Sequence, residues 1–510
     1  MELKLLMKTA RMAVIEICDG DKFETENEFT IRVNGETYMT TGRTVVSVYG
    51  LEPNTDNVVT VIREHSTEEL HFHTDLEIVT LNVKAFGAKG DGVSNDTPFI
   101  QAAISSCPKG GRVVVPAGVY KIYPIFLRSH ITFEIQKDAV LSAFTDRENF
   151  PILPGNVPSN DEKGEYFLGT WEGEPAPMFA GIITAVKVKD TTVCGEGTID
   201  GCASEENWWF EPKKIRIATR PRMIFFDQCK DMRVQGITVK NSPSWNLHPY
   251  FSKDLGFYDL KIISPKVSPN TDGLNPESCK NVNIVGVYFS VGDDCIAIKS
   301  GKIYMGAKYK TPSKGLSIRK CRMQDGHGAI VIGSENAGGV KDLLVEDCEF
   351  KNTDRGLRIK TRRGRGKDAV VDGVTFNRID MDHVMTPVVI NEFYFCDPDG
   401  HSDYVQTKEA LEVDERTPEL GDFLFKDIKA TNCHVAASYI YGLPEKKVKS
   451  VRFENVDISF TDEPVAGVPA MMDGVDPMTR CGLFAKNVEN LELENVTITG
   501  QEGQAFIIEQ

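Results

Sequence analysis

The stretch Lys280-Asn281-Val282-Asn283-Ile284-Val285-Gly286-Val287 joins a polar turn to a run of alternating β-branched residues. Similar units begin 23 to 34 residues apart, at Lys230, Lys253, Lys280, Lys314, Lys341 and Lys367, and again later at Lys426 and Lys486. Repeats of about 20 to 50 residues, with short strands and little helical periodicity, indicate a solenoid. Each coil must stack on the next to bury its apolar face. The sequence therefore predicts an all-β fold, a parallel β-helix.

The first part of the chain has a different pattern. Residues 12–17, 29–33 and 58–62 alternate like half-exposed strands, with turn residues such as Asn34-Gly35 between them. The full length of 510 residues exceeds what one compact core usually spans. We therefore expect two domains, a small antiparallel β-sandwich over residues 1–81 and the β-helix over residues 82–510.

Between the two expected domains, the solenoid needs a cap. Asp96 or Thr97 is a plausible N-cap, with Pro98 in the first turn of a short helix that ends near Cys107. Such a helix would close the open end of the β-helix core.

Composition limits the class of protein. The apolar content is 41% and the formal net charge is −16, and no run of eighteen apolar residues occurs that would predict a transmembrane helix. Charged residues interrupt residues 1–8, so we expect a cytoplasmic protein, or a secreted one if a leader has been removed. The 12 cysteines form no C-x-x-C pair, which favours reduced, buried packing residues over a zinc site or a disulfide framework.

Four short signatures carry the chemical information. They are Asn270-Thr271-Asp272, Asp293-Asp294, Gly326-His327-Gly328 and Arg358-Ile359-Lys360, in that order along the repeats. Together they supply three carboxylates, one imidazole and two cations. This set is suited to general acid and base catalysis on a glycosidic bond between acidic sugars.

The spacing of the carboxylates predicts a shared cleft. Asp272 and Asp293 are 21 residues apart, close to one coil, so stacking would place them side by side. Adjacent strand residues normally face opposite sides, so Asp293 and Asp294 need a bend, which Gly292 permits. Crowded carboxylates repel one another, which raises the proton affinity of one of them.

The later signatures predict the rest of the site. His327 follows Asp294 by 33 residues, about one longer coil, and its glycine neighbours allow a close approach to a ligand. Arg358 and Lys360 alternate across Ile359, so in a strand both face the same side, where they can grip a carboxylate. The cationic run continues through Arg362, Arg363, Arg365 and Lys367, which predicts a local concentration of positive charge for a polyanion. A solvated loop is the alternative; the acidic chain and the lack of a binding motif argue against nucleic acid.

These signatures resemble those of the polygalacturonases, the family 28 glycoside hydrolases, from about residue 82 to the end of the chain. The resemblance implies a right-handed parallel β-helix and inverting hydrolysis of α-1,4-galacturonosyl bonds in pectic polymers or oligogalacturonides, with no metal or other cofactor. It implies no nucleic-acid or membrane partner. The module over residues 1–81 is similar to the fibronectin type III-like module that precedes some bacterial pectinases.

By the same resemblance, Asp293 is the general acid, while Asp272 and Asp294 hold and deprotonate the attacking water. His327 tunes the protonation of the acid. The residues implied to bind the sugar and its carboxylate are Asn270, Arg358, Lys360 and Tyr394.

Two long insertions favour cleavage from a chain end. Residues 146–178, and the segment Glu205-Glu206-Asn207-Trp208-Trp209-Phe210, carry aromatic residues that could wall off one end of the cleft. Trp208 and Trp209 could equally belong to the core. Bacterial exo-acting members of the family are similar in these stretches.

Two rival functions share the expected fold. A pectate lyase would need a calcium-binding carboxylate cluster and an arginine or lysine base. A non-catalytic carbohydrate-binding or adhesin-like solenoid would explain the fold and the cations, but gives no reason for Asp272, Asp293, Asp294 and His327 to occur together.

Overall fold

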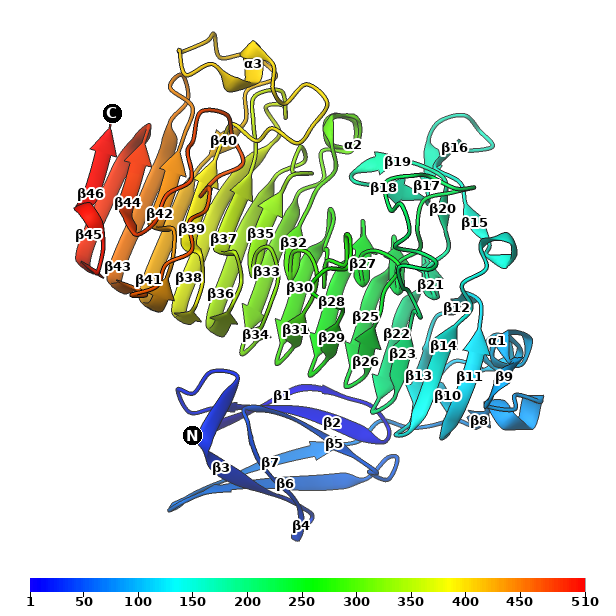
Figure 1. Cartoon of the computed structure of the whole chain (residues 1–510). Helices are drawn as coiled ribbons and strands as arrows, with labels where there is room; N and C mark the ends of the chain where they lie inside the picture. Colours follow the sequence, from blue (N-terminus) through cyan, green and yellow to red (C-terminus); the bar gives the residue numbers. More distant parts are fainter. Residues whose placement is uncertain (510) are drawn as a thin grey trace.

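The computed structural model describes residues 1–509, which form a long stack of strand coils with a small sandwich packed along one side (Figure 1). The fold class predicted from the repeats is therefore confirmed: a parallel β-helix preceded by an antiparallel β-sandwich. No helix within residues 1–509 has the length and apolar character needed to cross a membrane.

The N-terminal module consists of two antiparallel sheets. The first contains β1 (Glu2–Lys8), β2 (Met12–Cys18) and β5 (Val45–Tyr49), and the second β3 (Glu24–Val33), β4 (Glu36–Arg43), β6 (Asp56–Arg63) and β7 (Ser66–His73). Ile15, Phe29 and Val61 are among the residues that fill the core between them. The last antiparallel strand ends at His73, and the predicted boundary after residue 81 lies inside the first solenoid strand, Thr80–Asn82.

A 22-stranded sheet covers two sides of the solenoid. Its strands are β8 (Thr80–Asn82), β9 (Asp91–Asn95), β10 (Gly111–Val115), β11 (Gly118–Ile122), β13 (Ile131–Ile135), β14 (Ala139–Ala143), β22 (Lys189–Gly195), β23 (Thr198–Asp200), β25 (Lys230–Gln235), β26 (Thr238–Lys240), β28 (Lys253–Tyr258), β29 (Lys261–Ile263), β30 (Lys280–Val285), β31 (Tyr288–Ser290), β33 (Ser313–Arg319), β34 (Arg322–Met323), β36 (Val340–Lys351), β38 (Val370–Asp382), β40 (Glu419–Leu420), β41 (Asp422–Cys433), β43 (Val448–Phe460) and β45 (Val488–Thr499).

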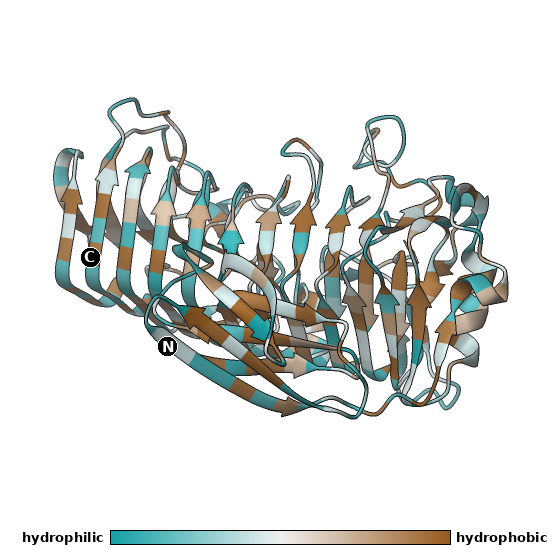
Figure 2. Ribbon diagram, turned by 90° about the horizontal axis from the view of Figure 1, so that it is seen from below, coloured by the Kyte–Doolittle hydropathy of each residue, from teal (hydrophilic) through white to brown (hydrophobic). Residues whose placement is uncertain are grey.

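Two further parallel sheets form the third side. One contains β12 (Ile125–Phe126), β21 (Ile183–Val186), β24 (Ile224–Asp227) and β27 (Leu247–Tyr250); the other contains β32 (Ile296–Ile298), β35 (Ile330–Gly333), β37 (Arg355–Lys360), β39 (Thr386–Asn391), β42 (Ala436–Tyr441), β44 (Cys481–Lys486) and β46 (Glu502–Glu509). Figure 2 shows apolar residues in brown and polar residues in teal along the strands of the solenoid. The apolar side chains point into one continuous core.

The remaining elements lie outside the three faces. They are the helices α1 (Thr97–Ser106), α2 (Ile303–Tyr309) and α3 (Asp403–Gln406), the short 3-10 turns η1 (Val83–Phe86) and η2 (Arg147–Asn149), and the strand pairs made from β15 (Ile152–Leu153), β16 (Asn156–Pro158), β17 (Glu165–Phe167), β18 (Thr170–Trp171), β19 (Glu174–Pro175) and β20 (Met178–Phe179).

The lysine turns fix the register of the coils. Lys253 pairs with Lys280, and Lys280 pairs with Lys314 in neighbouring parallel strands. The residue after each lysine, such as Asn281 with φ of 56°, adopts a left-handed conformation. Asp, Asn and Gly tolerate that conformation best, which explains the repeated turn chemistry.

Three predicted repeat positions, Lys367, Lys426 and Lys486, are wrong in register, and Lys486 pairs with Tyr441 in a strand of the third side. Lys341 pairs with Asp372 rather than with a residue beside Lys367, which lies in a loop. Lys426 pairs with Asn377 and so occupies a different corner of the coil. The same polar turn serves two corners of each coil, so the sequence spacing alone does not distinguish them.

The core of the later coils contains an aromatic stack. Phe350, Phe376, Phe425 and Phe453 occupy successive coils, with ring centroids 6.5, 5.7 and 4.9 Å apart. These contacts are edge-to-face, tilted and stacked in turn, and aromatic contacts of this kind add to the free energy gained by burying the rings. The stack runs through strands β36, β38, β41 and β43 and therefore supports the later coils of the solenoid.

Helix α1 covers the N-terminal end of the core, where Ile100, Ala103 and Ile104 are buried. Pro98 lies in its first turn as expected. Asp96 occupies the N-cap position, but its carboxylate accepts hydrogen bonds from the backbone N–H groups of Lys89 and Gly90 instead of from the helix. The cap residue therefore holds the preceding glycine loop.

The N-terminal module packs on the corner of strands β25 to β33. Arg319 donates three hydrogen bonds to Glu16, from Nε to Oε1 and Oε2 at 2.8 and 3.0 Å and from Nη2 to Oε2 at 2.9 Å. Ser47 donates to Asp259 at 2.6 Å, and apolar residues of both parts form a joint cluster that includes Val14 and Val285. The module is thus bound to the solenoid by charge pairs and by packing.

Candidate active site

A cavity of about 570 Å³ opens on the third side of the solenoid. All eight residues predicted for the site line it: Asn270, Asp272, Asp293, Asp294, His327, Arg358, Lys360 and Tyr394. They come from five successive coils. Stacking therefore brings together residues that are more than a hundred positions apart in the chain.

The coil that carries Asn270 and Asp272 interrupts the third side. Between β27 and β32 only single bridges occur, in which Leu274 joins Leu247 to Ile296. Asn270 itself has a left-handed φ of 57°. The loss of a regular strand here turns polar side chains outward into the cavity while Leu274 remains in the core.

Asp293 and Asp294 lie in the bend just before β32, as predicted. The reason for Gly292 differs from the prediction, because its φ is not in the left-handed region. A Cβ at this position would lie 2.3 Å from the carbonyl oxygen of Ser268. Glycine is needed because the neighbouring coil approaches so closely.

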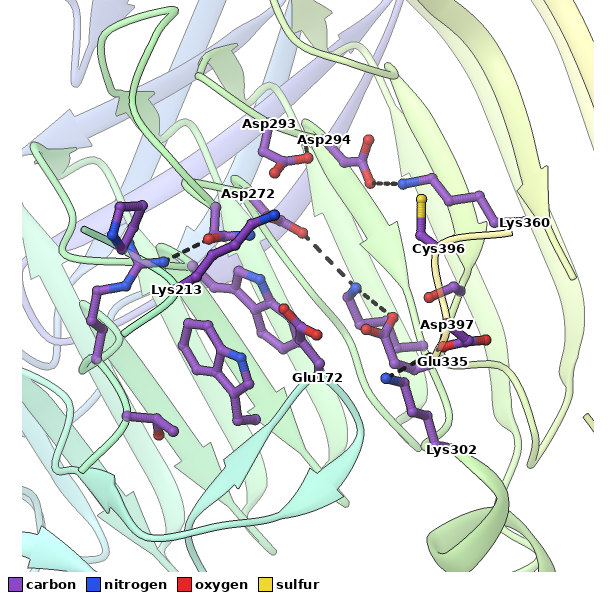
Figure 3. Close-up of a pocket in the computed structure, with 18 of the residues that line it drawn as sticks. Glu172, Lys213, Asp272, Asp293, Asp294, Lys302, Glu335, Lys360, Cys396 and Asp397 are labelled. Carbon is purple, nitrogen blue, oxygen red and sulfur yellow. Dashed lines mark hydrogen bonds and ion pairs between the residues drawn. The ribbon is translucent and has the colours of Figure 1, made fainter. Parts of the chain in front are cut away.

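The three carboxylates are close to one another. One oxygen from each of Asp272, Asp293 and Asp294 lies within 4.8 Å of the others (Figure 3). In inverting glycosidases the two catalytic carboxyl groups are typically about 6.5 to 9.5 Å apart. The distance of 4.8 Å found here is shorter, and it is measured between single oxygens of the three carboxylates. The separation does not by itself select inversion.

Electrostatics divides the carboxylates into an acid and a base. Burial, together with the charge of Asp293, raises the pKa of Asp272 to about 8. Burial also acts to raise the pKa of Asp293, but the hydrogen bond from His327 and the charge of Lys360 outweigh it and lower the pKa to about 2. The pair thus holds its proton on Asp272, whereas the sequence resemblance implied Asp293 as the acid.

Asp294 is oriented as a base. Its Oδ2 accepts a hydrogen bond from Lys360 Nζ at 2.7 Å. Its Oδ1 is buried and has no hydrogen-bond partner among residues 1–509. A buried carboxylate oxygen with no donor is suited to accept a proton from a water molecule in the cavity.

His327 lies against Asp293, with 3.4 Å between Nδ1 and Oδ1. The hydrogen bond to Asp293 raises the pKa of His327, despite partial burial. A Cβ on Gly326, whose φ is 144°, would lie 2.7 Å from the carbonyl oxygen of Asp293. Glycine at this position is therefore required for the imidazole to reach the carboxylate.

Arg358 and Lys360 both face the cavity from β37, with Ile359 in the core between them. Lys360 is already paired with Asp294. Arg358 is buried and has no ion-pair partner among residues 1–509. Tyr394, from the next coil, completes this side of the cavity, and burial raises its pKa, so its hydroxyl remains a donor.

On the opposite side, Arg220 Nη2 donates to Asn270 Oδ1 at 2.6 Å. Arg220 Nη1 donates to the carbonyl oxygens of Pro243 and Pro269 at 2.7 and 3.0 Å. No sequence pattern indicated Arg220, because it precedes its strand by several residues and belongs to none of the four signatures.

A buried charge network lies beneath the acids. Lys299 Nζ is 2.7 Å from Glu335 Oε2 and 3.9 Å from Asp272 Oδ2. His248 Nε2 is 2.9 Å from Glu277 Oε2, and both side chains are fully buried. Sequence reasoning did not identify these residues. Five positions separate Lys299 from Asp294, and no spacing rule assigns it to the same cavity.

The prediction that the basic run after Lys360 concentrates charge for a polyanion is wrong. Arg363 is 1% exposed and donates to both carboxylate oxygens of Glu445, at 2.6 and 2.8 Å. Arg362 and Arg365 are buried against Asp397. These guanidinium groups hold the loops after β37 and do not line the cavity.

Of the two predicted insertions, the first contributes to the cavity wall, whereas no residue of the segment 205–210 lines the cavity. Trp171 and Glu172 of the first insertion line it, as do Lys213 and Ile215, which follow the second segment. Trp208 and Trp209 belong to the core, and Trp208 is fully buried against Phe150. Trp208 and Trp209 are therefore core residues, and the alternative that they wall off the cleft is wrong.

Asp272, Asp293 and Asp294 are also close enough to hold a metal ion. Lys299, Lys360 and His327 already bring positive charge to the same carboxylates. The expectation that the site works without a metal or cofactor stays a prediction, which an assay after dialysis against a chelator tests.

Comparison with known proteins gives the family. Residues 165–471 match the model of the glycosyl hydrolases family 28. Residues 80–133 match a model described as rhamnogalacturonase A/epimerase, pectate lyase-like. A "Probable polygalacturonase" from Vitis vinifera is 33% identical over 73% of this chain and 73% of its own length.

Two solved structures are similar to the whole fold. A family 28 exopolygalacturonase from Yersinia enterocolitica has a TM-score of 0.74 at 19% identity, covering 100% of this chain and 98% of its own. A hyperthermoactive exopolygalacturonase from Thermotoga maritima has a TM-score of 0.67 at 25% identity, covering 82% and 92%. On the family match and the Vitis vinifera relative, this chain belongs to the glycosyl hydrolases family 28.

Proposed function

We propose that this enzyme hydrolyses α-1,4-galacturonosyl bonds of polygalacturonate or oligogalacturonides and releases sugar from a chain end. The observation that carries the proposal is the cavity lined by three carboxylates. Lys299 forms an ion pair with Asp272, and Lys360 forms one with Asp294. Arg358 also lines the cavity and has no ion-pair partner within residues 1–509. The family membership and the names of its relatives support the same substrate class.

The residues take the following roles in the proposal. Asp294 accepts a proton from the attacking water through its unpartnered Oδ1. Asp272 helps to hold that water, and Asp293 protonates the leaving oxygen. Arg358 binds a galacturonate carboxylate, because a planar guanidinium offers two parallel N–H donors. Lys360, Tyr394 and Asn270 contribute further polar contacts to the sugar.

In this proposal, the proton shared by Asp272 and Asp293 must move from one to the other when substrate binds. The Asp272 and Asp293 pair holds one proton, chiefly on Asp272. Their oxygens are close enough for substrate contacts to redistribute that proton within the pair. Asp293 becomes a competent acid only if the proton moves to it as Asp272 engages the water.

Cleavage from a chain end is supported by the walls of the cavity. Trp171 and Glu172 of the first insertion line the cavity, as do Lys213 and Ile215, which lie just after the second. A polymer that ran through the cleft in both directions would have to pass these side chains. A closed end favours a terminal sugar over an internal one.

The test compares product formation by wild type with Asp293→Asn and Asp294→Asn variants on trigalacturonate and on polygalacturonate. We expect reducing sugar without an unsaturated product, small products from the earliest times, and a loss of at least about a thousandfold in kcat for either variant. Proton NMR of the first product reports the anomeric configuration and so tests inversion.

Three outcomes would reject parts of the proposal. An unsaturated product absorbing in the ultraviolet would indicate a lyase. Random shortening of the polymer would reject chain-end cleavage. Full activity of Asp294→Asn would reject its role as the base. The cytoplasmic location expected from the sequence stays a prediction, which fractionation of the source cells tests.

A further inference from the structure

A row of lysines runs along one corner of the solenoid, outside the cavity. It occupies the first or second position of six neighbouring parallel strands, β22, β25, β28, β30, β33 and β36 (Figure 1). Each lysine is paired in register with the lysine of the next strand. The lysine row consists of Lys189, Lys230, Lys253, Lys280, Lys314 and Lys341, and it ends at Asp372 of β38. Five coil steps of ~4.8 Å give it a length of about 24 Å.

The turn at this corner does not explain why lysine recurs there. The residue that follows each lysine adopts a left-handed conformation, with φ between 52° and 69°, and is Asp, Asn or Gly. That conformation restricts the second residue and leaves the lysine position free. Like charges that lie opposite one another on neighbouring strands also repel and destabilise the sheet. The lysine row therefore costs stability, and local structure gives no reason for it.

The positive charge of the lysine row is largely uncompensated. Within residues 1–509, Lys314 is the one member that forms an ion pair, with Asp342 at 3.3 Å. Other aspartates of the turns are engaged elsewhere; Asp231, for example, lies 2.6 Å from Arg233 Nη2. The six lysines outnumber the four aspartates that follow them in the chain. A protein with a net charge of −16 thus carries a line of positive charge at this corner.

The lysine row is open to solvent. Five of its members are exposed and Lys341 is half-buried. The N-terminal module contacts the opposite ends of the same strands, through residues such as Tyr258 of β28 and Val285 of β30. None of the six lysines lines the cavity. On the coils of the site, Lys280 follows Asp272 by 8 residues, so the lysine row runs parallel to the catalytic residues, one corner further along each coil.

We propose that the lysine row is a second, non-catalytic binding surface on which polygalacturonate docks outside the cavity. The inference rests on the proposed function, which makes a uronic acid polymer the substrate. Such a polymer carries one carboxylate per sugar, and amines at every coil step can attract several of them at once. Docking raises the concentration of chain ends near the cavity, as a second binding module does. A trimer that occupies the cavity has no chain left to reach the lysine row.

The spacing of the lysines favours this polymer over duplex DNA. A duplex carries one negative charge per about 1.7 Å of its axis and presents two phosphate strands. The lysine row offers a single file of cations, one per ~4.8 Å, with aspartates such as Asp254 and Asp342 beside it. A single chain with one charge per sugar ring matches that spacing more closely.

The test compares wild type with a variant that carries Lys230→Gln, Lys253→Gln and Lys280→Gln. We expect KM for polygalacturonate to rise about tenfold, because three exposed contacts, each weak by itself, are lost together. The kcat on the polymer and kcat/KM for trigalacturonate should not change. Added salt should raise KM for the polymer more steeply in wild type than in the variant. Calorimetric titration of polygalacturonate into both proteins, each also carrying Asp294→Asn to block cleavage, measures binding directly.

Two control variants isolate the charge of the lysine row. Substitution of the same three lysines by arginine keeps the charge and should keep the wild-type KM. A variant with Lys137→Gln, Lys261→Gln and Lys449→Gln loses the same charge from exposed lysines outside the row, and its KM for polygalacturonate should match that of wild type. Thermal unfolding reports on folding. The glutamine variant of the row should be at least as stable as wild type, because it relieves repulsion between opposite lysines.

The outcomes separate this surface from the hydrolase proposal. Unchanged KM and affinity for polygalacturonate in the glutamine variant of the row would overturn the surface and leave the hydrolase proposal standing. An equal loss on trigalacturonate would also overturn it, because the substitutions would then act through the cavity. Retardation of duplex DNA that depends on the lysine row, with no effect on polygalacturonate, would assign the surface to nucleic acid instead. If wild type cleaves no galacturonate chain, the proposed function fails, and the titration of the Asp294→Asn proteins still decides whether the row binds the polymer.

Discussion

At the scale of single residues, the surroundings of the site give two aspartates different pKa values. Asp272 and Asp293 are both aspartates, yet burial raises the pKa of one to about 8 and His327 helps to lower that of the other to about 2. The pair therefore carries one proton across the pH range between these values. An enzyme that needs an acid and a base together gains both from one cluster.

The first prediction concerns pH. The pair loses its remaining proton as pH rises through about 8, so kcat/KM should fall there, and it gains a second proton only in strong acid. His327→Gln removes the partner that stabilises the charged form of Asp293, which raises the pKa of Asp293. The acidic limb of the pH profile should then move to higher pH. Profiles of kcat/KM between about pH 3 and 9 measure both limbs.

His401→Gln is the control for this measurement, because His401 is exposed and pairs with Asp473 outside the cavity. Its profile should match that of wild type. An acidic limb that stays in place in His327→Gln would mean that the imidazole does not control Asp293.

At the scale of elements, β37 and the loop after it use the same residue type for two purposes. Arg358 points from the strand into the cavity and has no ion-pair partner within residues 1–509. Arg363, five positions later, is buried and donates to both oxygens of Glu445. The chain changes direction between Arg358 and Arg363. One arginine of the same basic run therefore lines the cavity, and the other forms a buried ion pair.

The second prediction contrasts these two arginines. Arg363→Met leaves Glu445 buried without its partner, which should lower the free energy of unfolding by about 3 to 5 kcal/mol. The activity per folded molecule should remain near normal. Arg358→Met should have the opposite profile, with a loss of about a hundredfold in kcat/KM and little change in stability.

Thermal unfolding followed by circular dichroism, together with steady-state kinetics, measures both quantities. Arg416→Met is the control for the loss of a guanidinium, since Arg416 is exposed and pairs with Asp414. Equal thermal loss in Arg358→Met and Arg363→Met would show that both arginines are structural.

At the scale of the whole molecule, the N-terminal module braces one corner of the solenoid. Figure 1 shows the module alongside the coils of the solenoid. The contacts combine the Glu16–Arg319 pair, the hydrogen bond from Ser47 to Asp259 and a joint apolar cluster. None of these residues lines the cavity.

The third prediction is that the module contributes stability and not chemistry. In a double-mutant cycle of Glu16→Gln and Arg319→Met, we expect a coupling energy of about 1 to 3 kcal/mol in the free energy of unfolding. The kcat on trigalacturonate should stay within about twofold of wild type in all three variants. A selective loss of kcat would instead mean that the module shapes the cavity through the solenoid.

Much of the fold was predictable because it depends on local periodicity. Turn residues that tolerate a left-handed backbone and alternating apolar residues recur in each coil, so the sequence alone determined a β-helix and the order of its coils. The four signatures were predictable for the same reason, since one coil separates each from the next. Stacking then brings them into a single cavity.

Tertiary structure alone decided the protonation state of each charged side chain and the groups with which it pairs. Arg363 finds Glu445 82 positions away, and Arg220 reaches Asn270 50 positions away. The pKa values of Asp272 and Asp293 depend on burial and on Lys299, Lys360 and His327 from other coils. Electrostatic energy depends on distance through space and on exclusion of water, and neither quantity is a function of position along the chain.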